Sequence, residues 1–208
     1  MSIFLKGIKR PFLVTIVLLL ICGLVYPLLL TGISRIIFPR QANGSLITVN
    51  GQAVGSKLIG QDFTDTRFMK CRPSAVNYNT YTKEDKESGK YTGVGSGSKN
   101  YASTNPELVK RVEADITEFL KANPSVMKED IPTDLLTASG SGLDPHISPA
   151  SAAVQVPALV EATGLSKETL EAIVKENTQG KLLGIFGEET VNVLMVNLDI
   201  AKELGLIK

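Results

Sequence analysis

The 208-residue sequence contains no tryptophan, and aromatic residues make up only 6% of it. It therefore lacks the ring surfaces on which bases commonly stack, and the same scarcity argues against a carbohydrate-binding platform. The 22 basic residues nearly balance the 21 acidic ones, so no broad positive surface for nucleic acid is expected. These shortages exclude a charged polymer as the expected ligand, and we predict no nucleic-acid partner.

Cysteine is also scarce, since the chain has only Cys22 and Cys71. Neither a CxxC pair nor zinc-type spacing is present, which excludes a thiolate metal centre. Because Cys22 falls in a long apolar run, Cys71 is alone in the rest of the chain and no internal disulfide is expected there. The sequence also lacks a carboxylate cluster that would argue for an ion site of its own. We predict no metal and no tightly bound cofactor.

The N-terminal region has a long run without charge. No residue from Pro11 to Ser34 is charged. At about 1.5 Å of rise per residue, the run is long enough to cross a hydrocarbon core of roughly 30 Å. A cleaved signal peptide is the competing interpretation, but the run is longer than a signal h-region and no A-x-A-like cleavage site follows it. We predict an uncleaved transmembrane helix over residues 11–36, in which Pro27 removes one helix hydrogen bond.

Positive charges flank this run on both sides, with a small excess before it. They are the free amine, Lys6, Lys9 and Arg10 on one side, and Arg35 and Arg40 on the other. The positive-inside rule then favours a cytoplasmic segment at residues 1–10 and an extracytoplasmic soluble domain at residues 37–208. The predicted location is the cell (inner) membrane, in a single pass.

The soluble part opens with a hairpin signal and continues into a polar stretch. Asn50-Gly51 lies between two alternating runs in SLITVNGQAVGS, the pattern of a two-residue hairpin turn. Lys57–Gly60 is expected to add another short strand. From Asn77 to Tyr101 the chain is polar and rich in Gly, Ser and Thr, which predicts a long irregular loop that is functional or mobile.

Helical spacing of apolar residues then predicts four helices, each opened by a capping residue. They run from Asn105 to Asn123-Pro124, from Ser148-Pro149 to Gly164, from Ser166 to Gly180, and from Asn192 to Leu204. Leu182–Phe186 is expected to form a strand. The predicted fold class is α+β, with one N-terminal transmembrane helix followed by a small mixed α/β extracytoplasmic domain.

The only histidine lies in SGSGLDPHISPASA, residues 139–152. One interpretation is acid–base chemistry, in which Asp144 orients His146 and Ser139 or Ser141 is the nucleophile. The chain would then be a membrane-anchored hydrolase. However, a triad normally draws its members from separate elements, and no G-x-S-x-G elbow is present.

The structural interpretation of the same stretch is a turn at Asp144-Pro145 that leads into a helix. Ser148 would be its N-cap and Pro149 its first residue, while His146 hydrogen-bonds backbone groups or a partner. We favour this interpretation over catalysis.

Two glycine runs and one arginine remain. The runs at residues 93–98 and 140–142 complete neither G-x-x-x-x-G-K-[ST] nor a strand-to-helix G-x-G-x-x-G, so we predict flexible loops and no phosphate cradle. Arg72-Pro73-Ser74 is compatible with a buried ion pair or with a surface contact to a partner.

Six strings, taken in order, carry a resemblance to a known family. They are QANGSLI at 41–47, GSKLIGQDF at 55–63, CRPSA at 71–75, SGSKN at 96–100 followed by Asn105-Pro106, SGSGLDPHISPASA at 139–152, and GEETVNVLMVNL at 187–198. With the single leading span and the overall length, the collinear set resembles the C subunit of the Kdp potassium-transporting P-type ATPase over nearly the whole chain. The chain departs from the family pattern at three positions: Cys71 stands in place of Gly, Pro157 in place of Arg, and Met195 where Glu is frequent.

This resemblance implies a non-catalytic accessory subunit of an ATP-driven, high-affinity potassium importer. Its implied partners are a channel-like potassium-binding subunit, an ATP-hydrolysing pump subunit and a small single-span subunit. The family is held to assist assembly and to act as a catalytic chaperone that raises the pump subunit's affinity for ATP, with Gln155 associated with the shared nucleotide. A domain outside the membrane cannot reach cytoplasmic ATP. The predicted orientation therefore favours a lid over the potassium entrance, docked on the channel-like subunit.

The remaining motif residues are expected to hold the structure or to dock partners. They are Arg72, Pro73, Ser74, Ser139, Ser141, Gly142, Leu143, Asp144, Pro145, His146, Ser148, Pro149, Asn192 and Asn197. Two other functions stay open at this point, namely the hydrolase that uses His146 and Asp144 and a standalone extracytoplasmic binding module.

Overall fold

A computed structural model describes residues 2–91 and 93–207 of the chain. By the density of its internal contacts the chain separates into two compact units, Met1–Leu46 and Ile47–Lys208.

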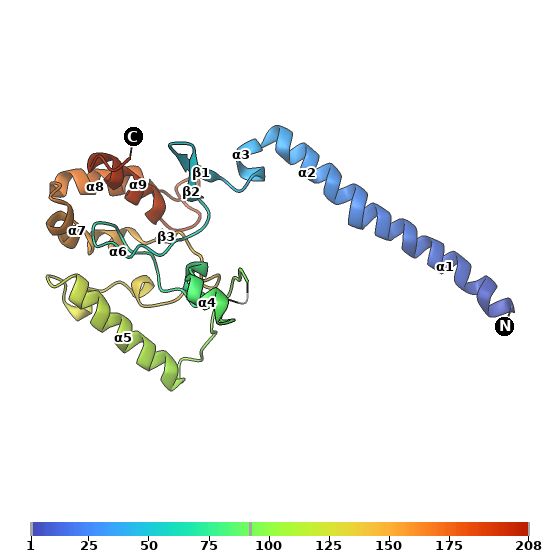
Figure 1. Cartoon of the computed structure of the whole chain (residues 1–208), viewed down its shortest axis with the longest axis horizontal. Coiled ribbons are helices and arrows are strands. Elements are labelled where there is room, and N and C mark those ends of the chain that lie inside the picture. Colours follow the sequence, from blue (N-terminus) through green and yellow to red (C-terminus); the bar gives the residue numbers. More distant parts are fainter. Residues whose placement is uncertain (1, 92, 208) are drawn as a thin grey trace. The chain divides into compact units, whose positions relative to one another are not determined.

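The first unit is a nearly continuous helix (Figure 1). It comprises α1 (Ser2–Leu20), a π-helical turn (Ile21–Val25), α2 (Tyr26–Ile37) and the short α3 (Pro39–Ala42). Pro27 has no N–H to bond a carbonyl one turn back, and the π-turn lies directly before it, with the Tyr26 N–H bonded to the Ile21 carbonyl. Gly7–Ile37 is long and apolar enough to cross a membrane, so the expected single N-terminal apolar helix is confirmed.

The second unit begins with a two-stranded hairpin, β1 (Leu46–Val49) and β2 (Gln52–Ser56). Its turn residues Asn50 and Gly51 have φ values of 51° and 79°, which confirms the predicted turn. The prediction of a strand at Lys57–Gly60 is wrong, because these residues form a turn. The Leu58 N–H bonds the Ser56 hydroxyl and the Gly60 N–H bonds the Leu143 carbonyl, so both groups are engaged in a turn and a loop contact.

A three-stranded antiparallel sheet has the order β3 (His146–Ile147), β5 (Thr190–Asn192) and β4 (Thr178–Gln179). In register, His146 pairs with Asn192 and Val191 pairs with both Ile147 and Thr178. The prediction of a strand at Leu182–Phe186 is also wrong. These residues form a turn between β4 and β5, closed by one isolated bridge between Leu182 and Phe186.

The unit also contains the helices α5 (Pro106–Ala122), α6 (Pro149–Ala153), α7 (Val156–Thr163), α8 (Lys167–Glu176) and α9 (Val193–Glu203). The predicted caps Asn105 and Asn192 accept backbone N–H bonds at α5 and α9, which confirms those two helices. The single helix expected after Ser148 is two helices. Pro157 lacks the N–H that would bond the Ala153 carbonyl, and the helix is interrupted between Ala153 and Val156.

The predicted end of the helix that starts at Ser166 is wrong, and the predicted irregular loop at residues 77–101 contains short helical segments. Helix α8 ends at Glu176 and does not reach Gly180, because residues 178–179 enter the sheet as β4. The polar stretch 77–101 is mostly irregular, but it contains a 3-10 turn (Asn77–Asn79) and the short α4 (Lys83–Glu87). Two more 3-10 turns, Lys128–Asp130 and Thr133–Leu135, follow α5.

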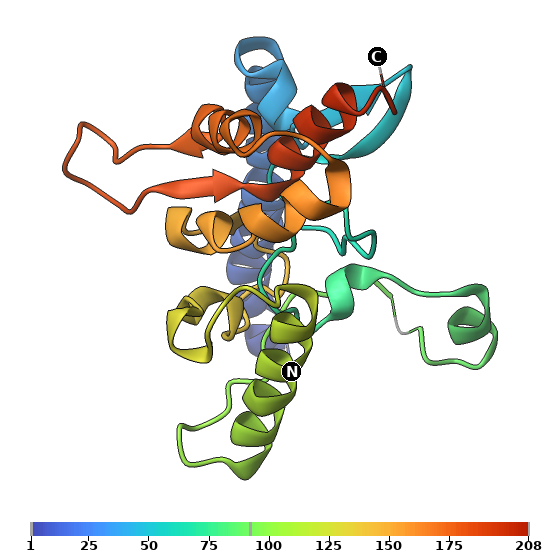
Figure 2. The ribbon, with the colours of Figure 1, turned by 90° about the vertical axis from the view of Figure 1, so that its left-hand side faces the viewer.

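The core lies among α6 to α9 and strand β5. Its largest fully buried side chains are Met69, Leu170, Ile200, Val191, Val193, Val196 and Ser151. Helix α5 forms a separate layer at the edge of this core, as Figure 2 shows in yellow-green, and packs against it through the partly buried Ile116, Phe119 and Leu120. The loop that contains the histidine contributes Ile147 to this core.

Candidate functional site

The loop of residues 139–149, which we call the 139–149 loop, is the meeting point of segments that are distant in the sequence. Ser74 Oγ donates to the Gly142 carbonyl at 2.6 Å, and the Gly60 N–H donates to the Leu143 carbonyl at 2.8 Å. The Gly97 N–H donates to the Ser141 carbonyl at 2.7 Å. Three of the strings that carry the family resemblance thus bond to this loop, which belongs to a fourth string.

Two glycines make this close packing possible. A Cβ at Gly60 would lie 2.5 Å from the Asp144 carbonyl oxygen, and one at Gly142 would lie 2.8 Å from the Gly97 carbonyl oxygen. Gly142 also has a φ of 68°, which glycine adopts without penalty. The glycines at these two positions therefore allow backbones to approach each other.

Asp144 ties the loop to the Arg72 segment. Arg72 Nη1 lies 3.0 Å from Asp144 Oδ2, and Arg72 Nε lies 3.4 Å from the Thr137 carbonyl. The other oxygen, Asp144 Oδ1, accepts the backbone N–H of His146 at 3.0 Å. Burial by itself would raise the pKa of Asp144, but the hydrogen bonds from His146 and Arg72 outweigh it and lower that pKa. Of the two possibilities for Arg72, the structure shows a partly buried ion pair.

The ring nitrogens of His146 face Asp144 and Asn192. Its Nδ1 is 3.6 Å from Asp144 Oδ1, and its Nε2 is 3.4 Å from the Asn192 amide nitrogen. Ser139 and Ser141 face each other with their hydroxyl oxygens 3.5 Å apart. Within the described residues no serine hydroxyl bonds His146, so the geometry does not support the hydrolase hypothesis.

The C-terminal end of the loop starts α6 as predicted. Ser148 Oγ accepts the Ser151 N–H at 3.1 Å, and Pro149 is the first residue of the helix. Asp134 strengthens this cap, since it accepts the Ser148 N–H at 2.7 Å and hydroxyl bonds from both serines. Sequence reasoning missed Asp134. No local pattern indicates it, because it lies fourteen residues before the cap.

Two buried side-chain amides hold the chain at Met69 and Lys70. Asn197 accepts the Met69 N–H at 2.7 Å and donates to the Met69 carbonyl at 2.9 Å. Gln155 accepts the Lys70 N–H at 2.8 Å and donates to the carbonyls of Ser151 and Lys70, at 3.0 and 3.3 Å. Their side chains are 3% and 4% exposed. Gln155 was predicted to associate with nucleotide, which would require its amide to leave these bonds.

Cys71 lies at the start of the Arg-Pro-Ser segment, next to Tyr78. Burial raises the pKa of the Cys71 thiol to about 12 and is also the main cause of the raised pKa of Tyr78. The Tyr78 hydroxyl donates to the Arg72 carbonyl. Tyr78 therefore helps to hold Arg72 in place, a role that the sequence did not indicate. Cys71 is protonated and shielded at neutral pH.

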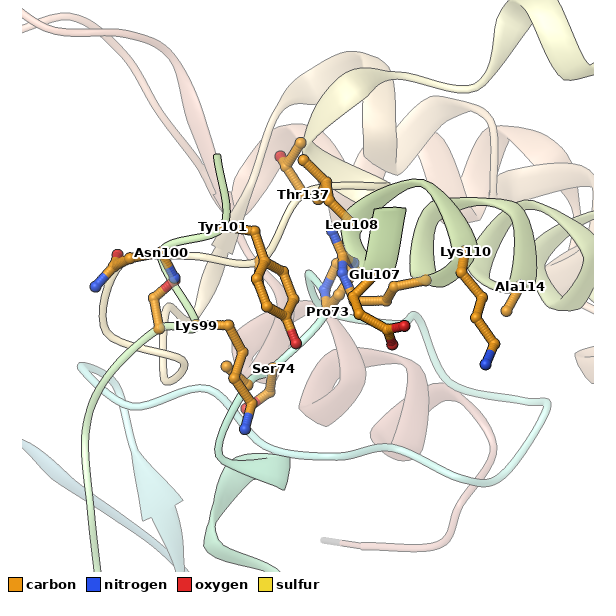
Figure 3. A pocket seen from close by; sticks show the side chains of 14 residues that line it. Pro73, Ser74, Lys99, Asn100, Tyr101, Glu107, Leu108, Lys110, Ala114 and Thr137 are labelled. Carbon is orange, nitrogen blue, oxygen red and sulfur yellow. The ribbon is translucent and has the colours of Figure 1, made fainter. Parts of the chain in front are cut away.

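A cavity of about 550 Å³ adjoins the loop, between α5 and residues 98–101. Figure 3 shows Ser74, Lys99 and Tyr101 on one side and Glu107, Lys110 and Ala114 of α5 on the other. Arg111 also lines it, but its guanidinium is bound to Asp115 and to the Leu136 carbonyl. The volume falls in the range of small-ligand sites. Its lining combines the lysines Lys99 and Lys110 with the carboxylate of Glu107.

The structure thus brings most predicted site residues together. Arg72, Ser74, Asp144, His146 and Asn192 are linked by hydrogen bonds or by sheet register around the 139–149 loop. Asn197 and Gln155 form the neighbouring pair of amide contacts, and Pro73 lines the cavity. Among the described residues, no group of three or more His, Cys, Asp or Glu side chains is placed to hold a metal ion.

Comparison with known proteins gives consistent results. The family model described as K+-transporting ATPase, c chain, matches residues 8–202. A potassium-transporting ATPase KdpC subunit from Clostridium kluyveri is 79% identical over 206 residues, covering 99% of this chain and 98% of the relative. The subunit of the same name from Clostridioides difficile is 62% identical, covering 98% of this chain and all of the relative, and one from Bacillus cereus is 47% identical, covering 96% and 97%.

Proposed function

The chain belongs to the KdpC family, the c chains of K+-transporting ATPases, and on that premise we propose that it is a non-catalytic accessory subunit of a high-affinity, ATP-driven potassium import complex. Its role is to assist assembly and to act as a catalytic chaperone that raises the ATP affinity of the pump subunit. Transport chemistry then belongs to the other chains.

The observation that carries this proposal is that the polar groups around the 139–149 loop are hydrogen-bonded to one another within the fold. Asp144 is bonded to Arg72 and to the His146 N–H, and the loop carbonyls accept bonds from three distant segments. A catalytic acid or base must instead reach a substrate proton. Groups that are already engaged within the fold stabilise a fixed surface, which suits a docking subunit.

The partners that we propose are a channel-like potassium-binding subunit, the ATP-hydrolysing P-type subunit and a small single-span subunit. The N-terminus lies in the cytoplasm and the domain lies outside it, where it forms a lid over the potassium entrance of the channel-like subunit. In this arrangement the apolar span Gly7–Ile37 packs against partner helices within the bilayer. The effect on ATP affinity is then transmitted through the complex.

Purification and growth test this function together. The tagged chain, extracted from native membranes in mild detergent, should bring a large polytopic protein and a P-type ATPase. Deleting its gene should stop growth at low potassium, whereas a standalone binding module would leave that growth normal. Expression of the His146→Ala variant in the deletion strain should restore growth at low potassium. If the chain were a hydrolase that uses His146, this variant would not restore growth. A clean preparation without either partner would count against the proposal.

A further inference from the structure

The turn between β4 and β5 exposes four large apolar side chains. Leu182, Leu183, Ile185 and Phe186 are 69%, 81%, 75% and 62% exposed. They belong to residues 181–187, which we call the apolar tip, and Figure 2 shows this segment extending away from the helices. Soluble proteins rarely expose apolar side chains in such a cluster, unless they form an interaction site.

The apolar tip has a defined backbone. Leu182 and Phe186 exchange two backbone hydrogen bonds, of 2.8 and 3.0 Å, across the turn. Leu183 has a φ of 54°, in the left-handed region that leucine rarely adopts, and Gly184 follows at 74°. Such a conformation costs about 1–2 kcal/mol for a leucine. Strain of this kind is concentrated at functional positions, and a fixed turn reduces the entropy lost when the side chains bind.

The charges beside the tip indicate what covers it. Glu188 and Glu189 follow it directly and are exposed, and within the part of the chain that the structure describes neither has an ion-pair partner. Segments that enter a membrane surface usually combine apolar side chains with Lys and Arg, whereas anionic lipids repel carboxylates. A symmetric contact between two copies of the tip would bring the same glutamates together. A protein cleft bordered by basic side chains satisfies both the apolar and the acidic groups.

We propose that the apolar tip inserts into an apolar cleft, bordered by basic side chains, on another subunit of the transport complex. This inference rests on the proposed function, since it needs a partner chain. Lys181 is the first residue of the tip and the two glutamates follow its last, so the strongest charge contact is expected on the side of Glu188 and Glu189.

Subunit retention tests the contact directly. The double variant Leu183→Asn and Phe186→Ser removes two of the exposed apolar side chains, and asparagine tolerates the positive φ, so the turn should still form. In the full complex we expect at least about tenfold weaker retention of partner subunits by the tagged chain. The matched control is Val94→Ser with Met127→Ser, which changes side chains that are 79% and 65% exposed elsewhere and should retain partners normally.

A charge-reversal variant tests the basic border. Glu188→Lys with Glu189→Lys should weaken retention, most clearly at low salt, because like charges then face each other. If the wild-type chain retains its partners and the tip variants retain them equally well, the inference is overturned while the proposed function stands. If the wild-type chain retains none, the proposed function itself fails.

Fluorescence separates a protein cleft from the other occupants. Because the chain has no tryptophan, Phe186→Trp places its only tryptophan at the tip, and subtracting the spectrum of the complex with the wild-type chain isolates its emission. Its emission should shift to shorter wavelength only in the assembled complex. A blue shift of the chain alone in phosphatidylcholine or phosphatidylglycerol vesicles at high dilution would assign the tip to the bilayer. A blue shift of the chain alone in detergent that grows with protein concentration would assign it to a second copy, and either result overturns the inference.

Discussion

Asp144 ties the 139–149 loop to Arg72 and also fixes the backbone at His146, because each of its oxygens accepts a different bond. Asp144→Asn should therefore lower the free energy of unfolding of the detergent-solubilised chain by about 1–3 kcal/mol near neutral pH. The lowered pKa of Asp144 sets the pH dependence. The stabilisation is fully present above the unfolded-state pKa of about 4 and is lost as the pH falls through the lower folded-state value.

Thermal unfolding followed by circular dichroism at several pH values measures this difference. The control is Asp65→Asn. The Arg67 side chain donates to Asp65 and lowers the pKa of Asp65 to about 2, but the Asp65 and Arg67 side chains are 39% and 42% exposed, so solvent screens the pair. We expect a smaller effect there. If the difference in stability between Asp144→Asn and the wild type stays the same in acid, the ion-pair explanation is contradicted.

Gln155 and Asn197 offer a matched pair at the same segment of backbone. Removing either amide leaves buried backbone groups at Lys70 or Met69 without a partner. Gln155→Ala and Asn197→Ala should each lower the free energy of unfolding by about 1–3 kcal/mol. Because both side chains are engaged within the fold, we expect the two variants to change the ATP concentration dependence of the complex's ATPase activity to the same extent.

The ATPase assay separates the two roles of Gln155. If Gln155→Ala raises the ATP requirement while Asn197→Ala does not, the buried-amide explanation is insufficient. The predicted association of Gln155 with nucleotide would then gain support.

At the level of secondary structure, caps were the most reliable local signal. Asn105, Ser148, Ser166 and Asn192 each accept a backbone N–H at the start of a helix, as their sequence contexts predicted. Chain breaks and strand ends were less predictable. The strand at Leu182–Phe186 was expected from its composition, but a turn with positive φ at Leu183 forms there. Composition alone does not report backbone conformation.

The cap of α6 has more contacts than an ordinary N-cap, because Asp134 bonds both the N–H and the hydroxyl of Ser148. Ser148→Ala removes a cap that is also bonded to Asp134, so helix α6 should be destabilised by about 1–2 kcal/mol. Ser166→Ala removes the exposed cap of α8, which bonds the Thr169 N–H and hydroxyl, and should cost less. Hydrogen–deuterium exchange of the α6 and α8 peptides measures both. Equal protection losses would indicate that Asp134 adds nothing to the cap.

At the scale of the whole molecule, orientation across the membrane is the property that the proposed lid requires. Ser103→Cys places a thiol on an exposed turn of the domain, and Ser2→Cys places one before the span. An impermeant maleimide added to intact, wall-permeable cells should label the first variant and not the second, which should react only after the membrane is opened. The reverse pattern would place the domain in the cytoplasm.

The native thiols give this experiment a low background. Cys22 lies inside the apolar span, where the aqueous reagent does not enter. The pKa of Cys71 is about 12, so its thiolate is scarce at neutral pH.

The amino-acid sequence by itself determined the features that depend on local physical chemistry. An uncharged run determined the long apolar helix, Asn-Gly determined the hairpin turn, and capping residues determined the starts of the helices. Collinear strings indicated the family, but not why those strings belong together. Only the tertiary structure showed that several of them meet at the 139–149 loop, through contacts such as Arg72–Asp144 that join residues 72 positions apart. Likewise, only packing distinguishes the buried Gln155 from the exposed apolar tip, because burial depends on neighbours supplied by distant parts of the chain.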